Sequence, residues 1–453
     1  MADRYKLYPE YKTVDIKFLK EIPIHWKTSK IRHISSFGRG LPITKSDLQD
    51  SGIPCVSYGE VHSKFGFEVD PKVNTLQCVN EEYLKTSTYA LLSKGDFVFA
   101  DTSEDIEGSG NFTQLVSDET LFAGYHTVIV RPNKNNYYRF VAYLFDSSQF
   151  RTQIRDAVKG VKVFSITQAI LKNTDVWLPS YQEQQKIASF LDHETAKIDT
   201  LIAKQEKLIE LLKEKRQAVI SHAVTKGLNP KVPMKDSGVE WLGEVPEHWV
   251  VAGFKRFLSS IVDYRGKTPN KVDNGKFLVT ARNIKKGIID YSLSQEFVSE
   301  EEYLDVMSRG LPEIGDVLFT TEAPLGEVAQ IDKTDIALAQ RIIKFRGCDG
   351  ILSNTFLKLF IMSSSFQDSL KMFASGSTAL GIKSERLVYL RQLVPPMEEQ
   401  LEIVEFVEEA SSQLDKLESK AQEAICLMKE RKAALISAAV TGKIDVRDWE
   451  GEH

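Results

Sequence analysis

The sequence predicts an α+β protein built as a tandem repeat, in which two mixed α/β domains are each followed by one long helix. Three observations support this prediction. Two blocks of sequence recur in the same order, the longer block has the periodicity of a coiled coil, and the segments between blocks alternate short apolar runs with turn residues. The chain has 453 residues, more than one hydrophobic core usually organises, so several domains are expected.

The longer repeated block begins beside a proline in each half of the chain. Residues 178–187 recur as residues 394–403, and Pro179 and Pro395 are 216 residues apart. The same offset continues without a gap, so that residues 213–225 match residues 429–441. A shorter block precedes each domain, because residues 18–26 match residues 241–249 at an offset of 223. The interiors between these blocks share only short pieces, such as residues 95–99 with 315–319, so the scaffold is repeated while its content differs.

The longer block has the apolar spacing of a coiled-coil helix, with steps of three and four residues. Each copy starts after a proline and stops at Gly227 or Gly442, which is typical of helix ends. Each helix is expected to run for about 40 residues, or roughly 60 Å. The two seams are expected to pack against each other, and packing of each helix on its own domain is the alternative. The predicted seam residues are Leu191, Ile198, Leu201, Leu208, Leu212, Val219, Val407, Leu414, Leu417, Ala424, Met428 and Leu435.

The unlike interiors have the pattern of mixed α/β domains. Short β-rich runs, such as residues 97–99 and 317–319, are separated by Gly, Pro and Asn from helical stretches such as residues 138–155 and 354–373. The predicted domains are residues 1–178 and 229–394, and the predicted helical regions are residues 179–228 and 395–453.

Composition excludes several classes of protein. Hydrophobic residues make up 42% and charged residues 27%, which is typical of globular domains. The four cysteines, Cys55, Cys78, Cys348 and Cys426, lack the spacing of a disulfide framework or a zinc site. With no signal peptide and no apolar run of about 20 residues, a cytoplasmic protein is expected. The net charge of −5 argues against a lone protein that coats DNA phosphates, but it does not exclude DNA recognition shared with partner subunits.

This order of features resembles the specificity subunits of type I restriction-modification enzymes. A Pro-x-His-Trp segment precedes each variable domain, and a Pro-x-x-x-Glu-Gln helix that ends in a basic stretch and Ala-Val-Thr follows it. The resemblance covers nearly the whole chain. It implies that each variable domain is a target recognition domain for one half of a split DNA site, and that the two helices pack antiparallel with pseudo-twofold symmetry and fix the spacing between the half-sites.

The resemblance also implies partners. Each helical region is expected to bind one adenine-N6 methyltransferase subunit, and motor-nuclease subunits are expected to join the complex. The resemblance implies no cofactor for this chain, and places S-adenosylmethionine, ATP and Mg²⁺ on the partner subunits.

Base edges are recognised by Arg, Lys, Asn, Gln or hydroxyl side chains on exposed loops, and such loops occupy matching places in the two halves. Residues 57–60 match 280–283, residues 38–40 match 264–266, and residues 125–126 match 340–341. For any single candidate a solvated loop charge or a satisfied polar group is at least as good an interpretation, and His126, beside an apolar run, can also be a core histidine. The DNA-binding candidates are Arg39, Ser57, Tyr58, Glu60, Tyr125, His126, Arg265, Thr280, Arg282, Asn283, Gln340 and Arg341, with Lys285 and Lys286 for phosphates.

No catalytic or metal site is predicted. The sequence lacks the Gly-rich loop and the Asn/Asp-Pro-Pro-aromatic motif of an adenine methyltransferase, and the segment 376–384 has Ile382 where a phosphate-binding loop places lysine. The acidic run at residues 103–107 is interpreted as a solvated loop. The alternative function is a scaffold whose paired helices hold two protein-binding domains, and the acidic net charge favours it.

Overall fold

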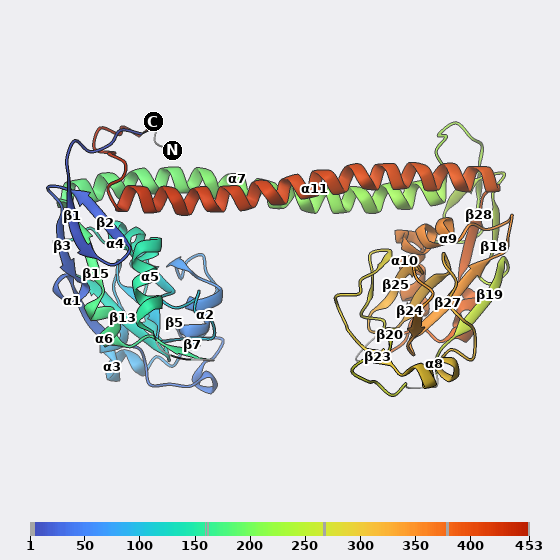
Figure 1. The fold of residues 1–453 in the computed structure, drawn as a ribbon, viewed down its shortest axis with the longest axis horizontal. Coiled ribbons are helices and arrows are strands. Elements are labelled where there is room, and N and C mark those ends of the chain that lie inside the picture. The colour runs from blue at the N-terminus through green and yellow to red at the C-terminus, as the bar shows by residue number, and fades with distance from the viewer. Residues whose placement is uncertain (1–4, 159, 161–162, 266–268, 377–379, 452–453) are drawn as a thin grey trace. The chain divides into compact units, whose positions relative to one another are not determined.

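The computed structural model describes residues 5–158, 160, 163–265, 269–376 and 380–451. It divides into two compact units, Met1–Lys204 with Ala424–His453 and Gln205–Glu423. Each unit contains one mixed α/β domain and a part of each long helix, α7 (Tyr181–Lys226) and α11 (Met397–Val440) (Figure 1). Residue 266 and residues 377–379, which belong to matched or loop segments of the sequence analysis, lie outside the described residues.

The domain of the first unit contains a five-stranded sheet of order β4-β13-β9-β11-β6 and a four-stranded sheet of order β7-β5-β12-β8. Phe97, Phe99 and Phe112 from the larger sheet pack against Phe145 of one helix, and Phe145 stacks on Phe150 of the adjacent helix. The elements are β1 (Tyr11–Ile16), β2 (Leu19–Pro23), β3 (Lys27–Lys30), α1 (Ile31–Ile34), β4 (Ser35–Arg39), β5 (Ile53–Val56), α2 (Tyr58–Ser63), β6 (Phe67–Val69), β7 (Cys78–Val79), α3 (Tyr83–Thr86), β8 (Leu91–Leu92), β9 (Phe97–Ala100), β10 (Thr102–Ser103), β11 (Phe112–Leu115), β12 (Leu121–Ala123), β13 (Thr127–Pro132), α4 (Tyr138–Asp146), α5 (Ser148–Ala157), β14 (Phe164–Ser165), α6 (Gln168–Asn173) and β15 (Asp175–Leu178).

The domain of the second unit contains a four-stranded sheet of order β19-β27-β24-β25 and a three-stranded sheet of order β23-β20-β26. Ile220 and Val224 near the end of α7 join Phe254 and Phe366 in its core. The elements are β16 (Met234–Asp236), β17 (Glu244–Pro246), β18 (Val250–Gly253), β19 (Leu258–Asp263), β20 (Lys276–Val279), β21 (Ile284–Lys285), β22 (Ile288–Ile289), β23 (Phe297–Val298), α8 (Glu300–Val306), β24 (Val317–Thr321), β25 (Leu325–Gln330), β26 (Ile336–Leu338), β27 (Ile342–Gly347), α9 (Asn354–Met362), α10 (Ser364–Phe373) and β28 (Arg391–Val394).

The repeated Gly-Asp segments occupy the same strand in both domains. Phe99 of β9 lies opposite Val128 of β13, and Phe319 of β24 lies opposite Ile343 of β27. The aspartate of each segment binds an arginine three residues further along the opposite strand, since Arg131 Nε lies 3.1 Å from Asp96 Oδ2 and Arg346 Nε lies 2.6 Å from Asp316 Oδ1. The two domains therefore share one scaffold, and this register aligns them residue by residue.

The two long helices run antiparallel within each unit, which confirms the predicted coiled coil. In the first unit, Lys432 Nζ lies 2.7 Å from Asp199 Oδ2, so the early part of α7 contacts the late part of α11 (Figure 1). In the second unit, Lys213 pairs with Glu418 and Arg216 pairs with Asp415, so the residue numbers rise on one helix as they fall on the other.

The predicted seam is wrong at three leucines. Leu201, Leu208 and Leu417 are 49%, 41% and 49% exposed. A step of four residues from Ile198 reaches the buried Ile202, whereas the prediction took a step of three. The predicted and the observed patterns coincide at every seventh residue, so most of the predicted seam residues are unaffected. The buried members are Leu191, Ile198, Leu212, Val407, Leu414 and Leu435, and Val219, Ala424 and Met428 are half-buried.

The two repeated blocks meet at a glutamate in each unit, which is buried in the first unit and half-buried in the second. Trp26 Nε1 donates to Glu183 Oε1 at 2.9 Å, and Trp249 Nε1 donates to Glu399 Oε2 at 3.0 Å. The preceding histidine of each Pro-x-His-Trp segment contacts the same carboxylate. Burial and the nearby Glu183 carboxylate raise the pKa of Tyr8, whose hydroxyl donates to Glu183 at 2.7 Å. This contact explains why the Pro-x-His-Trp and Glu-Gln motifs recur together.

Candidate nucleic-acid interface

Each domain places most of its candidate residues after the carboxyl ends of two adjacent parallel strands. In the first unit β5 and β12 are parallel, and Gly124 N donates to Val56 O at 2.8 Å. In the second unit β20 and β26 are parallel, and Ala339 N donates to Val279 O at 2.9 Å. Because parallel strands end at the same edge of a sheet, the loop after each strand reaches one common surface. Two of the three matched pairs of segments lie on these loops, 57–60 with 280–283 and 125–126 with 340–341.

In the first unit, Tyr58, Tyr125 and His126 form a cluster in which each pair of ring centroids is 5.9 Å apart. The His126 side chain is 59% exposed, so the interpretation as a core histidine is wrong. Burial and the Glu60 carboxylate raise the pKa of Tyr125, which keeps its hydroxyl neutral as a hydrogen-bond donor. Arg39 lies opposite Val128, two residues after His126, and stacks on the ring of Tyr89.

Two predicted DNA-binding residues are buried and shape the loops instead. Ser57 is fully buried at the start of α2, where its backbone N donates to the Glu60 carboxylate at 3.2 Å. Asn283 is also fully buried, and its Oδ1 accepts from Thr280 N at 2.9 Å. Its Nδ2 donates to the carbonyls of Asp290 and Ser294. The prediction that Ser57 and Asn283 contact bases is therefore wrong, because both side chains are fully buried and the Asn283 side chain bonds to the backbone of its own turn.

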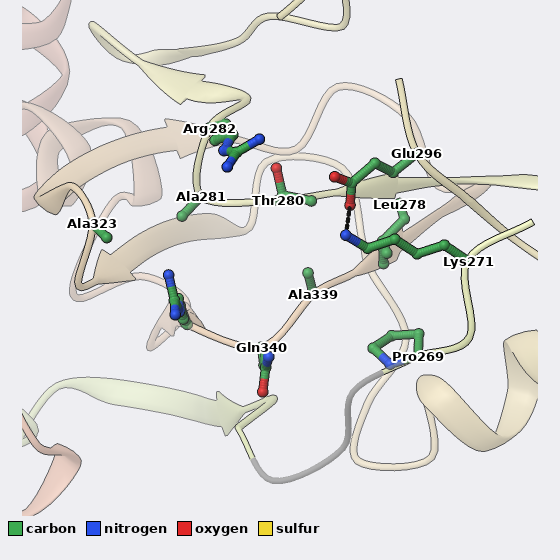
Figure 2. A pocket seen from close by; sticks show the side chains of 11 residues that line it. Pro269, Lys271, Leu278, Thr280, Ala281, Arg282, Glu296, Ala323, Ala339 and Gln340 are labelled. Carbon is green, nitrogen blue, oxygen red and sulfur yellow. Dashed lines mark ion pairs between the residues drawn. The ribbon is translucent and has the colours of Figure 1, made fainter. Parts of the chain in front are cut away.

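In the second unit, the loops surround a hollow of about 270 Å³, which we call the Arg341 hollow. Thr280 and Gln340 line it from the ends of the two parallel strands, and an ion pair between Lys271 Nζ and Glu296 Oε2 (2.8 Å) lies at one side (Figure 2). Four of the predicted residues thus meet at one site. The Arg341 hollow is lined by Pro269, Lys271, Leu278, Thr280, Ala281, Arg282, Glu296, Ala323, Ala339, Gln340 and Arg341.

Three other candidates lie outside the Arg341 hollow. Arg265 binds Asp263, with 2.6 Å between Nη2 and Oδ2. Burial raises the pKa of Asp263, but hydrogen bonds from Arg265 and Ser384 outweigh it and hold the pKa below its usual range. Lys285 and Lys286 are exposed at the β21–β22 turn.

The predicted match between Arg39 and Arg265 is shifted. Arg39 lies opposite Val128, and Asp263 lies opposite Ile343, so the structural equivalent of Arg39 is Asp263. The sequence comparison aligned the two arginines because it could not see the strand register.

Two carboxylates of this surface were not predicted. Asp101 Oδ1 lies 3.3 Å from His126 Nδ1, and Glu322 Oε1 lies 2.9 Å from Arg341 Nε. Both acids follow the matched strands β9 and β24, which was the available signal. Within the described part of the chain, no group of three His, Cys, Asp or Glu side chains is placed to hold a metal ion. No described helix is both long and apolar enough to cross a membrane.

The comparisons with known sequences agree on one family. The sequence profile of the type I restriction modification DNA specificity domain matches residues 23–211 and 255–426. The type I restriction enzyme EcoKI specificity subunit of Escherichia coli K12 is 23% identical over 449 residues, which are 96% of this chain and 92% of that protein. The putative MjaX specificity subunit of Methanocaldococcus jannaschii is 25% identical over 447 residues, covering 94% of this chain and 95% of that protein.

Solved structures share the fold. A chain from work on complex assembly and conformational transition of the type I R-M system superposes with a TM-score of 0.67 and 16% identity, covering 93% of this chain and 99% of that one. The HsdS subunit from Thermoanaerobacter tengcongensis superposes with a TM-score of 0.50 and 16% identity, covering 95% and 100%. Since the profile matches most of its length, the chain belongs to the type I restriction-modification DNA specificity family and is the specificity subunit, a non-catalytic part of such a system.

Proposed function

We propose that this specificity subunit recognises a split DNA sequence, and that each unit contacts one half-site through the loops after its parallel strand pair. The observation that carries the proposal is a repeated surface with unlike side chains. Tyr58, Tyr125 and His126 occupy it in the first unit, and Thr280, Gln340 and Arg341 occupy it in the second. A scaffold that is kept while its polar side chains change suits two domains that recognise different bases.

The proposed partners are two adenine-N6 methyltransferase subunits, bound at the helical regions, and motor-nuclease subunits that join the complex in the cytoplasm. S-adenosylmethionine, ATP and Mg²⁺ are proposed to bind to those partners. Leucines on the outer faces of the helices support a docking role, since exposed apolar groups on a helix outside the seam suit a protein partner. They are Leu201, Leu208, Leu211, Leu417 and Leu427.

A map of methylated adenines in the source organism tests the proposal. We expect one split motif with a fixed spacer to lose methylation when the gene is deleted and to regain it when the gene is restored. If the motif keeps its methylation in the deletion strain, a different specificity subunit directs it. If restored expression of this chain with its methyltransferase adds methylation at an unsplit motif, recognition by two separate units is wrong.

A further inference from the structure

The backbone takes the left-handed conformation at the same place in both units. His126 has a φ of 53° and Arg341 a φ of 81°. The two positions are equivalent, because Asp101 N donates to His126 O at 3.1 Å and Thr321 N donates to Arg341 O at 2.8 Å. Residues other than glycine rarely adopt this backbone conformation, and those that do cluster at functional sites. The scaffold thus keeps an unusual backbone at a position where the side chain differs.

Each of these side chains is held by a carboxylate. Arg341 Nε lies 2.9 Å from Glu322 Oε1, and 48% of the arginine side chain stays exposed. His126 Nδ1 lies 3.3 Å from Asp101 Oδ1, an oxygen that is shielded from solvent and makes no hydrogen bond with any described residue. The negative charge of the carboxylate favours the tautomer that carries its proton on Nδ1, and that tautomer leaves Nε2 as an acceptor. The carboxylate therefore fixes which edge of each side chain faces solvent.

We infer that His126 and Arg341 are the corresponding base-specifying residues of the two units, and that Asp101 and Glu322 are positioning residues that orient them. The inference rests on the proposed function and deepens it. A specificity-determining position is expected to combine a fixed backbone, a fixed orientation and a variable side chain, and the two units show all three at this position.

The free edges of the two side chains select different bases. The ion pair occupies the Nε side of Arg341, and no other described residue pairs with this side chain, so its Nη amines can donate to O6 and N7 of guanine, the commonest specific arginine contact in the major groove. Thr280 and Gln340 line the same hollow and offer further polar groups beside that base (Figure 2). The Nε2 acceptor of His126 instead suits the exocyclic amine of adenine or cytosine. The half-site of the second unit is therefore expected to contain a guanine that depends on Arg341.

The test uses the complex of this chain with its methyltransferase subunits and duplexes that carry its methylated motif. Each guanine is replaced in turn by 7-deazaguanine, which lacks the N7 acceptor, and the Kd is measured. For the wild-type complex, replacement of one guanine in one half-site is expected to weaken binding about 5- to 150-fold. In Arg341→Ala this penalty is expected to vanish at that guanine alone, and in Glu322→Gln it is expected to shrink.

Two further variants keep the test decisive. Arg341→Lys retains the charge, yet it is expected to reduce the penalty, because an ammonium lacks the planar fork that pairs with Glu322 on one side and contacts guanine on the other. His126→Ala is expected to keep the penalty and to change base preference in the other half-site, so each unit serves as the control for the other.

The inference is overturned if the wild-type penalty persists in folded Arg341→Ala, or if both Arg341 variants weaken binding to all sequences equally, as loss of a phosphate contact does. An unchanged penalty in Glu322→Gln overturns the positioning role. Failure of the proposed function looks different, because the wild-type complex would then methylate no split motif.

Discussion

Substitution of Glu183 by alanine is expected to destabilise the first unit strongly. Its carboxylate is only 5% exposed and contacts three groups, with Tyr8 Oη at 2.7 Å, Trp26 Nε1 at 2.9 Å and His25 Nε2 at 2.9 Å. Removing it leaves buried donors without an acceptor, and such a loss costs about 3–5 kcal/mol in the free energy of unfolding. For a unit of this size, that corresponds to a fall in Tm of roughly 6–20 °C.

The second unit supplies a matched control. Glu399 occupies the same motif but is 23% exposed, and its carboxylate contacts only His248 and Trp249 among the described residues that pair with it. Glu399→Ala is expected to cost about 1–2 kcal/mol. Urea unfolding of both variants, followed by tryptophan fluorescence and calorimetry, measures the difference. An equal cost for the two variants, or a cost below about 1 kcal/mol for Glu183→Ala, would refute the reasoning.

Three further predictions concern the ion-paired Asp316, the faces of the long helices and the ends of the chain. Burial raises the pKa of Asp316, but hydrogen bonds from Arg346 and Lys344 outweigh burial and hold this pKa below its usual range. The stability that Asp316 contributes is therefore full at neutral pH and is lost as the pH falls through that low pKa. Asp316→Asn should flatten the acid limb of a plot of unfolding free energy against pH, and an unchanged limb would contradict this. Leu208→Glu, at an exposed position, should change the free energy of unfolding by less than about 0.5 kcal/mol but should reduce the amount of methyltransferase that co-purifies. Leu212→Glu, at a buried seam position, should destabilise the chain by several times more. Equal effects of the two variants on stability would contradict the assignment of the seam. A circular permutant, in which the chain is opened in the loop at residues 229–231 and the original ends are joined by a short linker, should fold and direct the same methylation. Asp445 N donates to Lys6 O at 2.8 Å near those ends, so a short linker can join them. Loss of the folded complex would show that the native chain order is required.

The repeat was enough to predict the architecture. Copied blocks with a helical period predict two long helices, and unlike interiors predict two domains of separate content, since both inferences depend only on local pattern. The phase of the seam could not be predicted in the same way. Leu201 and Ile202 are adjacent and both apolar, and only the packing of α11 decides that Ile202 is buried.

The candidate surface was predicted by position better than by residue. Matching the two halves located the loops after the parallel strands, but a polar residue at a strand end can either cap the turn or face solvent, and sequence does not distinguish these. Ser57 and Asn283 are buried within the turn, whereas the side chains of His126 and Arg341 face solvent. The two carboxylates could not be found by matching the halves, because the backbone equivalent of Asp101 is Thr321 and the acid of the second unit lies one residue later, at Glu322.

The central claim, that each unit recognises its own half of a split site, is tested most directly by exchanging one domain. Residues 37–172 would be replaced by the corresponding segment of another specificity subunit, and methylated adenines would be mapped in cells that express the hybrid with its methyltransferase. We expect one half of the motif to change to that of the donor while the other half is retained. A change in both halves, or in neither half while methylation continues, would contradict recognition by two independent units.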